Sequence, residues 1–411
     1  MRVAWLGANP ADDAGVPYVA TQILQQLAVL GCEVDCFIPG TESELPVSLR
    51  NEENLRFFFS PTKWEWDRWY SRKPLAAFVT AQTMRVAAQV KLAGMLARRN
   101  DSEPYDCVYQ FSQIEATAVR RVRRRLSALL IHPQVHSAGE LRWHKREATV
   151  ARRCEPVPRQ LATRALLTAR TAVQRRDIRL ADALIAPSSC FADDLARDYG
   201  YPREQITVVP NPIDLERYSR DVRTNGNAKN SLTLLFVSRI SVRKGVEDIV
   251  ALSHRLADLA GRIRLRVVGN HTLWSDYRPL LASLNLSVAE YTGSATPTQL
   301  ANIYREADAL IQPSHYEPFG ITVGEALASG VPVVVTSSVG AAENVNPSCC
   351  RVVPDGALDH LEAEVRKLLD DVRGERRSEI RAVARSEAER LFAPSAVGAS
   401  IVNALARVAS D

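Results

Sequence analysis

Two carboxylates, Glu317 and Glu325, lie with seven residues between them in the stretch Gln312–Gly340. A carboxylate can accept hydrogen bonds from the hydroxyl groups of a sugar. Two glutamates at this spacing are also common on solvated helix faces, and the pair alone would favour that interpretation. The residues around this pair favour a binding site, because they predict a turn from a strand into a helix.

This turn would offer backbone N–H groups to an anion. The apolar run Ala309–Ile311 ends before Pro313, which predicts a strand and a loop, and Val323–Ser329 predicts a helix that ends at Gly330. The first N–H groups of a helix have no partner within the helix and lie at its partially positive end. The amides expected at this place are those of Gly320, Ile321 and Thr322. They would hold a phosphate beside the two carboxylates.

Two cations follow an earlier predicted strand. Residues 232–240 predict a strand, and a helix is expected after Gly245, which leaves Arg239 and Lys244 in the connecting loop. Two cations at the carboxyl end of a strand suit a pyrophosphate. Such pairs are also common on surfaces. Because Glu317 and Glu325 lie in the same half of the chain, anion binding is the favoured interpretation.

These segments resemble the retaining glycosyltransferases of family GT4. Glu-Pro-Phe-Gly at 317–320, Glu325 and Ser-Gly-Val-Pro at 329–332 are similar to the E-x7-E signature of that family. The stretch 236–245 resembles the family pattern V-G-R-L-x-x-x-K-G, with Ser238 in place of a common glycine. The resemblance implies an α/β protein of the GT-B fold, with two Rossmann-like domains facing a cleft and a C-terminal helix returning to the first domain.

The resemblance also implies a donor site and its chemistry. In relatives, residues matching Arg239 and Lys244 offset charge on the departing nucleoside diphosphate, the second Glu binds ribose hydroxyls, and the first contacts the transferred sugar. The expected donor-binding residues are Gly15, Ser238, Arg239, Lys244, Glu317, Phe319, Gly320, Ile321, Thr322 and Glu325. The expected reaction moves a sugar, with retention of configuration, from a nucleoside-diphosphate sugar to a glycan, lipid-linked or small-molecule acceptor. No metal or cofactor is expected.

The first half contributes two further candidates. Gly15 lies in a loop before a predicted helix, where GT4 members usually have two adjacent glycines, and it would either approach the donor or form a flexible turn. His136 follows a predicted strand and resembles a histidine that contacts the transferred sugar in relatives, so it joins Glu317, Arg239 and Lys244 as an expected catalytic residue. His132 is the competing candidate. A histidine beside an apolar strand is otherwise a core residue.

Short apolar segments alternate with helical patterns in both halves, which predicts two parallel sheets covered by helices. The expected strands are residues 3–7, 33–39, 55–60, 107–111, 127–131, 183–187 and 206–210, then 232–240, 264–269, 289–293, 309–313, 331–336 and 351–354. Residues 210–231, rich in Asn, Pro and Asp, predict a linker. The expected parts are an acceptor-binding domain at 1–209, a donor-binding domain at 210–392 and a C-terminal helix at 393–411. The absence of G-x-G-x-x-G after residues 3–7 argues against a dinucleotide-binding oxidoreductase.

Composition sets further limits on the class of protein. With 411 residues, 46% hydrophobic and 24% charged, the chain has the composition of a globular protein of two domains. No apolar run reaches the roughly 18 residues of a membrane helix. The seven cysteines are scattered without disulfide or zinc-ligand spacing, and they predict reduced packing residues. A cytoplasmic location is expected.

The charge is uneven, which bears on partners. Between Arg120 and Leu180 there are 16 Lys or Arg and 4 Asp or Glu, a net of +12, so the rest of the chain sums to 5 minus 12, or −7. Such a region attracts an acidic lipid surface, a phosphorylated acceptor or nucleic acid. Pro61–Pro74, rich in Trp and cations, is suited to an interfacial loop, a sugar-stacking platform or a lid. Peripheral contact with the inner face of a membrane is one interpretation of both segments.

Two other classes of function stay open at this point. One is another GT-B enzyme, such as a nucleotide-sugar epimerase. The other is a non-catalytic protein whose basic region binds nucleic acid. Because no recognised nucleic-acid motif accompanies the charge, a nucleic-acid partner is not expected.

Overall fold

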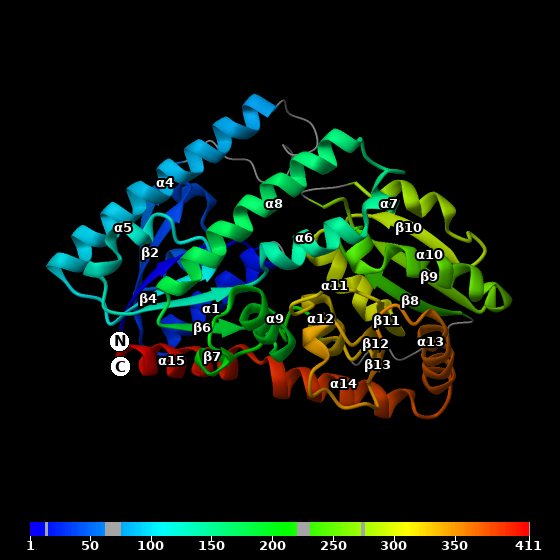
Figure 1. Cartoon of the computed structure of the whole chain (residues 1–411). Helices are drawn as coiled ribbons and strands as arrows, with labels where there is room; N and C mark the ends of the chain where they lie inside the picture. The colour runs from blue at the N-terminus through cyan, green and yellow to red at the C-terminus, as the bar shows by residue number, and fades with distance from the viewer. Residues whose placement is uncertain (13–14, 62–74, 220–230, 273–275, 411) are drawn as a thin grey trace. The chain divides into compact units, whose positions relative to one another are not determined.

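The computed structural model describes residues 1–410 except 13–14, 62–74, 220–230 and 273–275 (Figure 1). By their contacts, the residues form two compact units. Unit 1 comprises Met1–Arg142, Ala162–Pro212 and Pro394–Asp411, and unit 2 comprises Trp143–Leu161 and Ile213–Ala393. Residues 62–74 of the Trp-rich segment and residues 220–230, half of the predicted linker, lie outside the described residues.

Unit 1 is built on a parallel sheet of seven strands in the order β3-β2-β1-β4-β5-β6-β7. The strands are β1 (Arg2–Leu6), β2 (Glu33–Pro39), β3 (Leu55–Ser60), β4 (Cys107–Ser112), β5 (Leu129–Pro133), β6 (Ala183–Ala186) and β7 (Ile206–Val208). The interior residues of the five inner strands are buried, as expected of parallel strands covered on both faces, whereas those of the edge strands β3 and β7 are half-buried or exposed. The helices that lie wholly in this unit are α1 (Val16–Val29), α2 (Val47–Arg50), α4 (Leu75–Ser102), α5 (Val119–Val122), α9 (Ser189–Tyr199) and α15 (Pro394–Ser410).

The C-terminal helix α15 belongs to unit 1, as expected, although the helix before it belongs to unit 2. Its apolar face buries Val397, Ile401 and Leu405. Gly398 faces α1 so closely that a Cβ at this position would lie 2.6 Å from the Cβ of Gln26. In the view of Figure 1 the N and C marks lie next to each other, at the end of α15.

Unit 2 has a parallel sheet of six strands in the order β10-β9-β8-β11-β12-β13. The strands are β8 (Leu232–Val237), β9 (Ile263–Val268), β10 (Ala289–Gly293), β11 (Ala309–Gln312), β12 (Val333–Thr336) and β13 (Cys350–Val353). Its helices are α7 (Ala148–Ala151), α10 (Val246–Arg255), α11 (Pro297–Glu306), α12 (Ile321–Ala328), α13 (Leu358–Arg373) and α14 (Arg377–Phe392). In both sheets the first strand pairs with the second and fourth, which is the doubly wound order of Rossmann-like domains.

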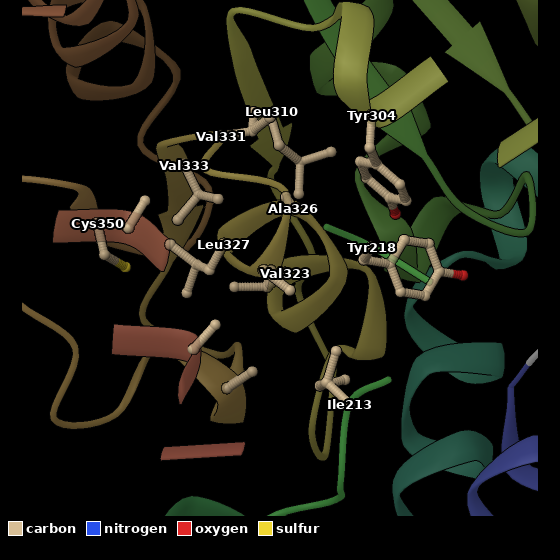
Figure 2. Packing of buried hydrophobic residues seen from close by; sticks show 14 of the residues in the cluster. Ile213, Tyr218, Tyr304, Leu310, Val323, Ala326, Leu327, Val331, Val333 and Cys350 are labelled. Carbon is tan, nitrogen blue, oxygen red and sulfur yellow. The ribbon is translucent and has the colours of Figure 1, made fainter. Parts of the chain in front are cut away.

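Both faces of the sheet in unit 2 are covered, because successive residues of β8 enter different cores. Leu235 and Val237 lie in one hydrophobic cluster, whereas Leu234 and Phe236 lie in another. Figure 2 shows the first cluster, in which the apolar side of α12 packs among β11, β12 and the segment around Ile213. Helix α12 is therefore held on several sides, and the loop before it starts from a rigid support.

Residues 143–161 belong to unit 2, whereas the predicted domain ranges put them in the first domain. Helices α6 (Ser137–Arg146) and α8 (Val157–Asp177) each have residues in both units. Ala151 is part of a hydrophobic core of unit 2. The carboxylate of Glu147 accepts a hydrogen bond of 2.8 Å from the hydroxyl of Tyr277. These buried contacts bring residues 143–161 into the second unit.

Two properties of the chain concern location and redox state. Within the described residues, the helical stretch Arg377–Ser410 is long and apolar enough to cross a membrane, with a mean hydropathy of 1.4 in its most apolar window. One such helix is weak evidence for a span, because core helices pass the same test. None of the seven cysteines forms a disulfide, and five of them are buried.

Candidate functional site

The carboxyl edge of the sheet in unit 2 brings together the loops that follow β8 and β11. These strands pair directly, with Leu235 opposite Leu310. They are the first and fourth strands of this sheet along the chain, yet they are neighbours in it, so the connections diverge between them. Ligands of open α/β sheets bind at such a point, because the two loops leave the sheet toward opposite faces.

Lys244 and Glu317 form an ion pair across these loops. Lys244 lies in a 3-10 turn, Val242–Lys244, and its Nζ donates a hydrogen bond to Oε2 of Glu317. The two side chains are only 11% and 14% exposed. A buried ammonium group keeps its charge at low cost only beside such a partner. The structure thus brings together two residues that the sequence predicts near the phosphates and sugar of a donor.

Main-chain contacts fix the two loops against each other. The carbonyl oxygen of Arg243 accepts hydrogen bonds from the N–H of His315 at 2.9 Å and of Tyr316 at 3.3 Å. Gly245 has a φ of 79°, and a Cβ at this position would collide with the carbonyl oxygen of Pro313. Glycine is required there by both conformation and space. The backbone therefore sets the distance between Lys244 and Glu317.

The turn after Glu317 is held by a neighbouring loop. The carbonyl oxygen of Glu317 accepts a hydrogen bond of 3.2 Å from the N–H of Gly340, and that of Phe319 accepts one of 2.7 Å from Ala341. The ring of Phe319 is buried and packs edge to face on Phe392, with centroids 5.6 Å apart. Phe319 thus anchors the turn from inside, and its donor-binding role stays a prediction.

Helix α12 begins without a side-chain cap at its first amides. Gly320 is the residue before the helix, has a φ of 101° and makes no side-chain cap. Ile321 and Thr322 are half-buried. Because the first N–H groups of a helix have no intrahelical acceptor, this turn suits a phosphate, three to five residues beyond Glu317.

Glu325 lies inside unit 2, where it meets two tyrosines. Glu325 is only 4% exposed. Its Oε2 accepts a hydrogen bond of 2.9 Å from the hydroxyl of Tyr304. Burial raises the pKa of Glu325 to about 7, although hydrogen bonds from Tyr218 and Tyr304 and the charge of Arg217 lower it. Figure 2 shows the two tyrosines lying next to each other. The sequence gives no sign of this pair, because neither tyrosine belongs to a motif.

Ser238 and Arg239 lie at the end of β8, on the same edge of the sheet. The hydroxyl of Ser238 donates a hydrogen bond of 3.1 Å to the carbonyl oxygen of Arg239. Arg239 is exposed and Ser238 half-buried. A Cβ on Gly269 would collide with the carbonyl oxygen of Ser238, so β9 approaches this strand end closely. The donor-binding roles of Ser238 and Arg239 stay predictions.

Gly15 precedes α1 in unit 1, in the loop after β1. It has a φ of 73°, which L-residues rarely adopt, and no neighbouring atom would meet a Cβ there. The conformation explains why glycine is suited to this position. Its contact with a donor stays a prediction.

His136 lies in the interior of unit 1, fully buried. Its Nε2 is 2.7 Å from Oδ2 of Asp198, which also accepts a hydrogen bond from Arg142, and its ring packs edge to face on Phe191 and Tyr199. These are the surroundings of a core histidine. A sugar-contacting role for His136 stays a prediction that none of these contacts supports.

His132, the competing candidate, is also fully buried. Its two ring nitrogens lie 2.7 Å from the hydroxyl of Tyr109 and 3.1 Å from Nε2 of Gln134. Burial lowers the pKa of His132 to about 3, so the ring is neutral at physiological pH. It too has the contacts of a structural residue.

Many arginines of the basic segment 120–180 have acidic partners from other elements. The pairs include Arg120 with Asp177, Arg123 with Asp182, Arg142 with Asp198 and Arg170 with Glu115. A carboxylate beside an arginine reduces the charge that a distant anion meets. The sequence suggested that the positive charge of residues 120–180 attracts an anionic partner. Ion pairs within the protein neutralise part of that charge.

Within the part of the chain that the structure describes, no three His, Cys, Asp or Glu residues are grouped to hold a metal ion. The site therefore rests on cations, amides and carboxylates. The expectation of a reaction without metal or cofactor stays a prediction.

Two family models match almost the whole chain. Residues 14–217 match the model described as Glycosyltransferase Family 4, and residues 219–387 match the model of glycosyl transferases group 1. The second match contains Ser238, Arg239, Lys244, Glu317 and Glu325.

Two relatives of this chain are named for the transfer or polymerisation of sugars. The chain is 34% identical over 210 residues to a glycogen synthase of Mycobacterium tuberculosis, a match that covers 49% of the chain and only 48% of that relative. It is 27% identical over 376 residues to the D-inositol 3-phosphate glycosyltransferase of Nocardiopsis dassonvillei, covering 87% of the chain and 82% of that protein.

Solved structures share the fold. Sucrose-phosphate synthase of Thermosynechococcus elongatus superposes with a TM-score of 0.74 at 18% identity, covering 99% of this chain and 98% of that one. The HepE protein of Anabaena, in complex with UDP-glucose, has a TM-score of 0.64 at 16% identity, covering 99% and 100%. Together with the two parallel sheets, the C-terminal helix and the family models, these likenesses show that the chain belongs to the GT4 family of glycosyltransferases with the GT-B fold.

Proposed function

We propose that this glycosyltransferase is a retaining hexosyltransferase that uses a nucleoside-diphosphate sugar and transfers the sugar to a hydroxyl group of a glycan, lipid-linked or small-molecule acceptor. The observation that carries the proposal is the Lys244–Glu317 pair at the divergence of β8 and β11, next to the uncapped start of α12. One cation, one carboxylate and a row of amides converge there. This set matches the chemistry of a sugar diphosphate.

Each group has a part in the proposed reaction. As the bond between sugar and phosphate breaks, negative charge grows on the diphosphate, and Lys244, Arg239 and the amides of residues 320–322 stabilise that charge. Glu317 accepts hydrogen bonds from hydroxyl groups of the sugar while it neutralises Lys244. Glu325 binds the ribose hydroxyls. No metal takes part in this proposal.

The ion pair bears on the route to the proposed retention of configuration, because a double displacement and an attack from the same face would both retain it. A double displacement would need a carboxylate that attacks the sugar, and the attacking oxygen would have to be free. Glu317 is engaged by Lys244, which makes it a poor nucleophile. We propose instead that the departing phosphate takes the proton of the acceptor, which then attacks from the same face of the sugar.

Relatives suggest the ligands to test first. HepE of Anabaena binds UDP-glucose, and the Nocardiopsis relative is named for D-inositol 3-phosphate. We therefore propose a UDP-sugar as the first donor to test and a phosphorylated polyol among the acceptors. The arginines of the basic segment give a reason for testing phosphorylated and lipid-linked acceptors. A cytoplasmic location, with peripheral contact at the inner face of a membrane, belongs to the same proposal.

The test is a panel of UDP-, GDP- and ADP-sugars measured by thermal stabilisation of the wild type and of two variants. Lys244→Gln removes the cation of the site. Lys367→Gln removes a lysine of α13 that pairs on the surface with Glu364, and it serves as the matched control. We expect one donor class to raise the melting temperature of the wild type and the control, and to have little effect on Lys244→Gln.

Turnover of that donor with a panel of acceptors then tests the reaction. Proton NMR of the product should show the anomeric configuration of the donor. Conversion of the donor without any acceptor would favour an epimerase. Salt-sensitive binding of RNA or DNA, with indifference to every nucleotide sugar, would favour the non-catalytic alternative.

A further inference from the structure

His315 occupies a position in the β11–α12 loop where both nitrogens of its ring meet carboxylates. Its Nε2 lies 3.2 Å from Oδ2 of Asp248, and its Nδ1 lies 2.5 Å from Oδ1 of Asp355. Asp248 is in the first turn of α10, and Asp355 follows β13. A carboxylate only accepts hydrogen bonds, so both contacts are satisfied together only when both nitrogens carry a proton. The ring is therefore held as an imidazolium.

The pKa of His315 agrees with this geometry. Burial alone would lower the pKa, but the hydrogen bonds to Asp248 and Asp355 and their charges raise it to about 9. The side chain is 16% exposed, so water weakens these interactions only in part. At neutral pH the group carries a full positive charge.

An aromatic ring covers the face of the imidazolium. The indole of Trp143, in α6, stacks on it with centroids 5.1 Å apart and an angle of 14° between the planes. The guanidinium of Arg146 lies near the Trp143 ring, 5.1 Å from its centroid. A cation over an aromatic face is attracted by the ring, and stacking fixes its plane. The side chain is thus held by α6, α10 and the loop after β13.

The backbone of His315 connects this clamp to the site. Its N–H donates to the carbonyl oxygen of Arg243, the residue before Lys244, and Glu317 follows two positions later. The charged groups that face or adjoin the imidazole are therefore Asp248, Asp355, Arg146 behind the indole, and the Lys244–Glu317 pair. His315 and Glu317 thus lie two residues apart in one loop.

We propose that the protonated His315 is a positioning residue for the Lys244–Glu317 pair, and that loss of its proton at high pH disturbs this pair and weakens donor binding. The inference rests on the proposed function, because it concerns the same donor site. Deprotonation removes one of the two bonds to the aspartates, and the loop loses one of its fixed points. The expected sign is loss of affinity as the pH rises through about 9.

The experiment measures donor KM and kcat between pH 6 and 10 for four proteins. Asp355→Asn keeps the imidazole but removes one carboxylate, so its alkaline loss should begin at least one pH unit below that of the wild type. His315→Gln should show a higher donor KM, about tenfold, without that pH dependence, as expected for a lost charge-assisted contact. His360→Gln changes an exposed histidine of α13 and should behave as the wild type.

An NMR titration measures the pKa of the His315 imidazole in the wild type and in Asp355→Asn. If His315 had only a structural role, this pKa would not follow the pH dependence of the donor KM. The midpoints of the titration and of the KM profile should move together. If the donor KM of Asp355→Asn follows the wild-type pH profile although the imidazole midpoint has moved, the inference is wrong and the proposed function stands. If the wild type binds no nucleotide sugar at pH 7, the proposed function fails and the inference fails with it.

Discussion

At the scale of single residues, burial gives Glu325 a chemistry that its motif does not reveal. Burial raises its pKa to about 7, above the ordinary value of 4.5. A carboxyl whose pKa is higher in the folded protein contributes stability below pH 4.5, and the contribution is lost as the pH rises through 7. Above pH 7 the charge on Glu325 therefore costs stability.

Replacing Glu325 by Gln should separate the effect of this charge on stability from its effect on donor binding. The amide keeps an acceptor for Tyr304 but has no charge, so we expect Glu325→Gln to be more stable than the wild type at pH 8, by up to about 3 kcal/mol. The gain should disappear near pH 4.5, where the wild type is protonated. Urea unfolding at the two pH values measures this difference. Donor-induced thermal stabilisation should be lost at both.

The matched control is Glu375→Gln, which changes a glutamate on the exposed surface after α13. It should leave the difference between pH 8 and pH 4.5 unchanged. A Glu325→Gln variant that is less stable than the wild type at pH 8 would mean that the carboxylate is needed by the two tyrosines, and the explanation from burial would be wrong.

The sequence was informative for motif residues and silent about their partners. The spacing of Glu317 and Glu325 and the resemblance around Lys244 pointed to a single site, and the structure joins Lys244 to Glu317. Tyr304 and His315 could not be found in this way, because their importance depends on what packs against them. His136 illustrates the opposite case, since a match in sequence says nothing about burial.

At the scale of elements, the prediction from patterning was accurate. All thirteen expected strands form, and their ends differ from the predicted ends by at most three residues. Apolar runs bounded by Gly, Pro and Asn are reliable because a strand buried on both faces admits few polar residues. The docking of residues 143–161 on unit 2 was not foreseen, since it depends on contacts such as Glu147 with Tyr277.

The start of α12 provides a prediction at this scale. At Gly320 a Cβ would lie 3.0 Å from Cγ1 of Val339 and 3.2 Å from Cγ of Glu317, and φ is 101°. We expect Gly320→Ala to lower stability by about 1–2 kcal/mol and to weaken donor binding, because the turn must move. Donor-induced thermal shifts and urea unfolding measure the two effects.

Gly261→Ala is the matched control for the loss of stability that comes from the positive φ alone. Gly261 also has a positive φ, of 77°, but nothing within 4 Å would meet its Cβ. It should lose stability through conformation alone and keep donor binding. Equal loss of binding in both variants would show that general destabilisation, and not the geometry of the turn, is responsible.

At the scale of the whole molecule, unit 1 includes the last helix of the chain, α15, although the preceding residues belong to unit 2. Residues 394–410 follow α14 of unit 2 directly, yet their buried side chains belong to unit 1. The helical stretch Arg377–Ser410 is long and apolar enough to span a membrane. The packing of α15 in unit 1 explains part of this apolar character, since Val397, Ile401 and Leu405 are buried. Unit 1 is thus formed from segments at both ends of the chain.

A pair of neighbouring substitutions in α15 tests this role. Gly398 faces Gln26 and Leu30, whose nearest atoms would lie 2.6 Å and 3.4 Å from an added Cβ, whereas the next residue, Ala399, is exposed. Gly398→Leu should force α15 away from α1 and lower stability by about 1–3 kcal/mol, the usual cost of overpacking. Ala399→Leu adds an apolar side chain of the same size to the same helix and should change stability by less than about 0.5 kcal/mol. Thermal unfolding of both variants measures the contrast, and the docking of α15 on α1 requires Gly398→Leu to be clearly the less stable of the two.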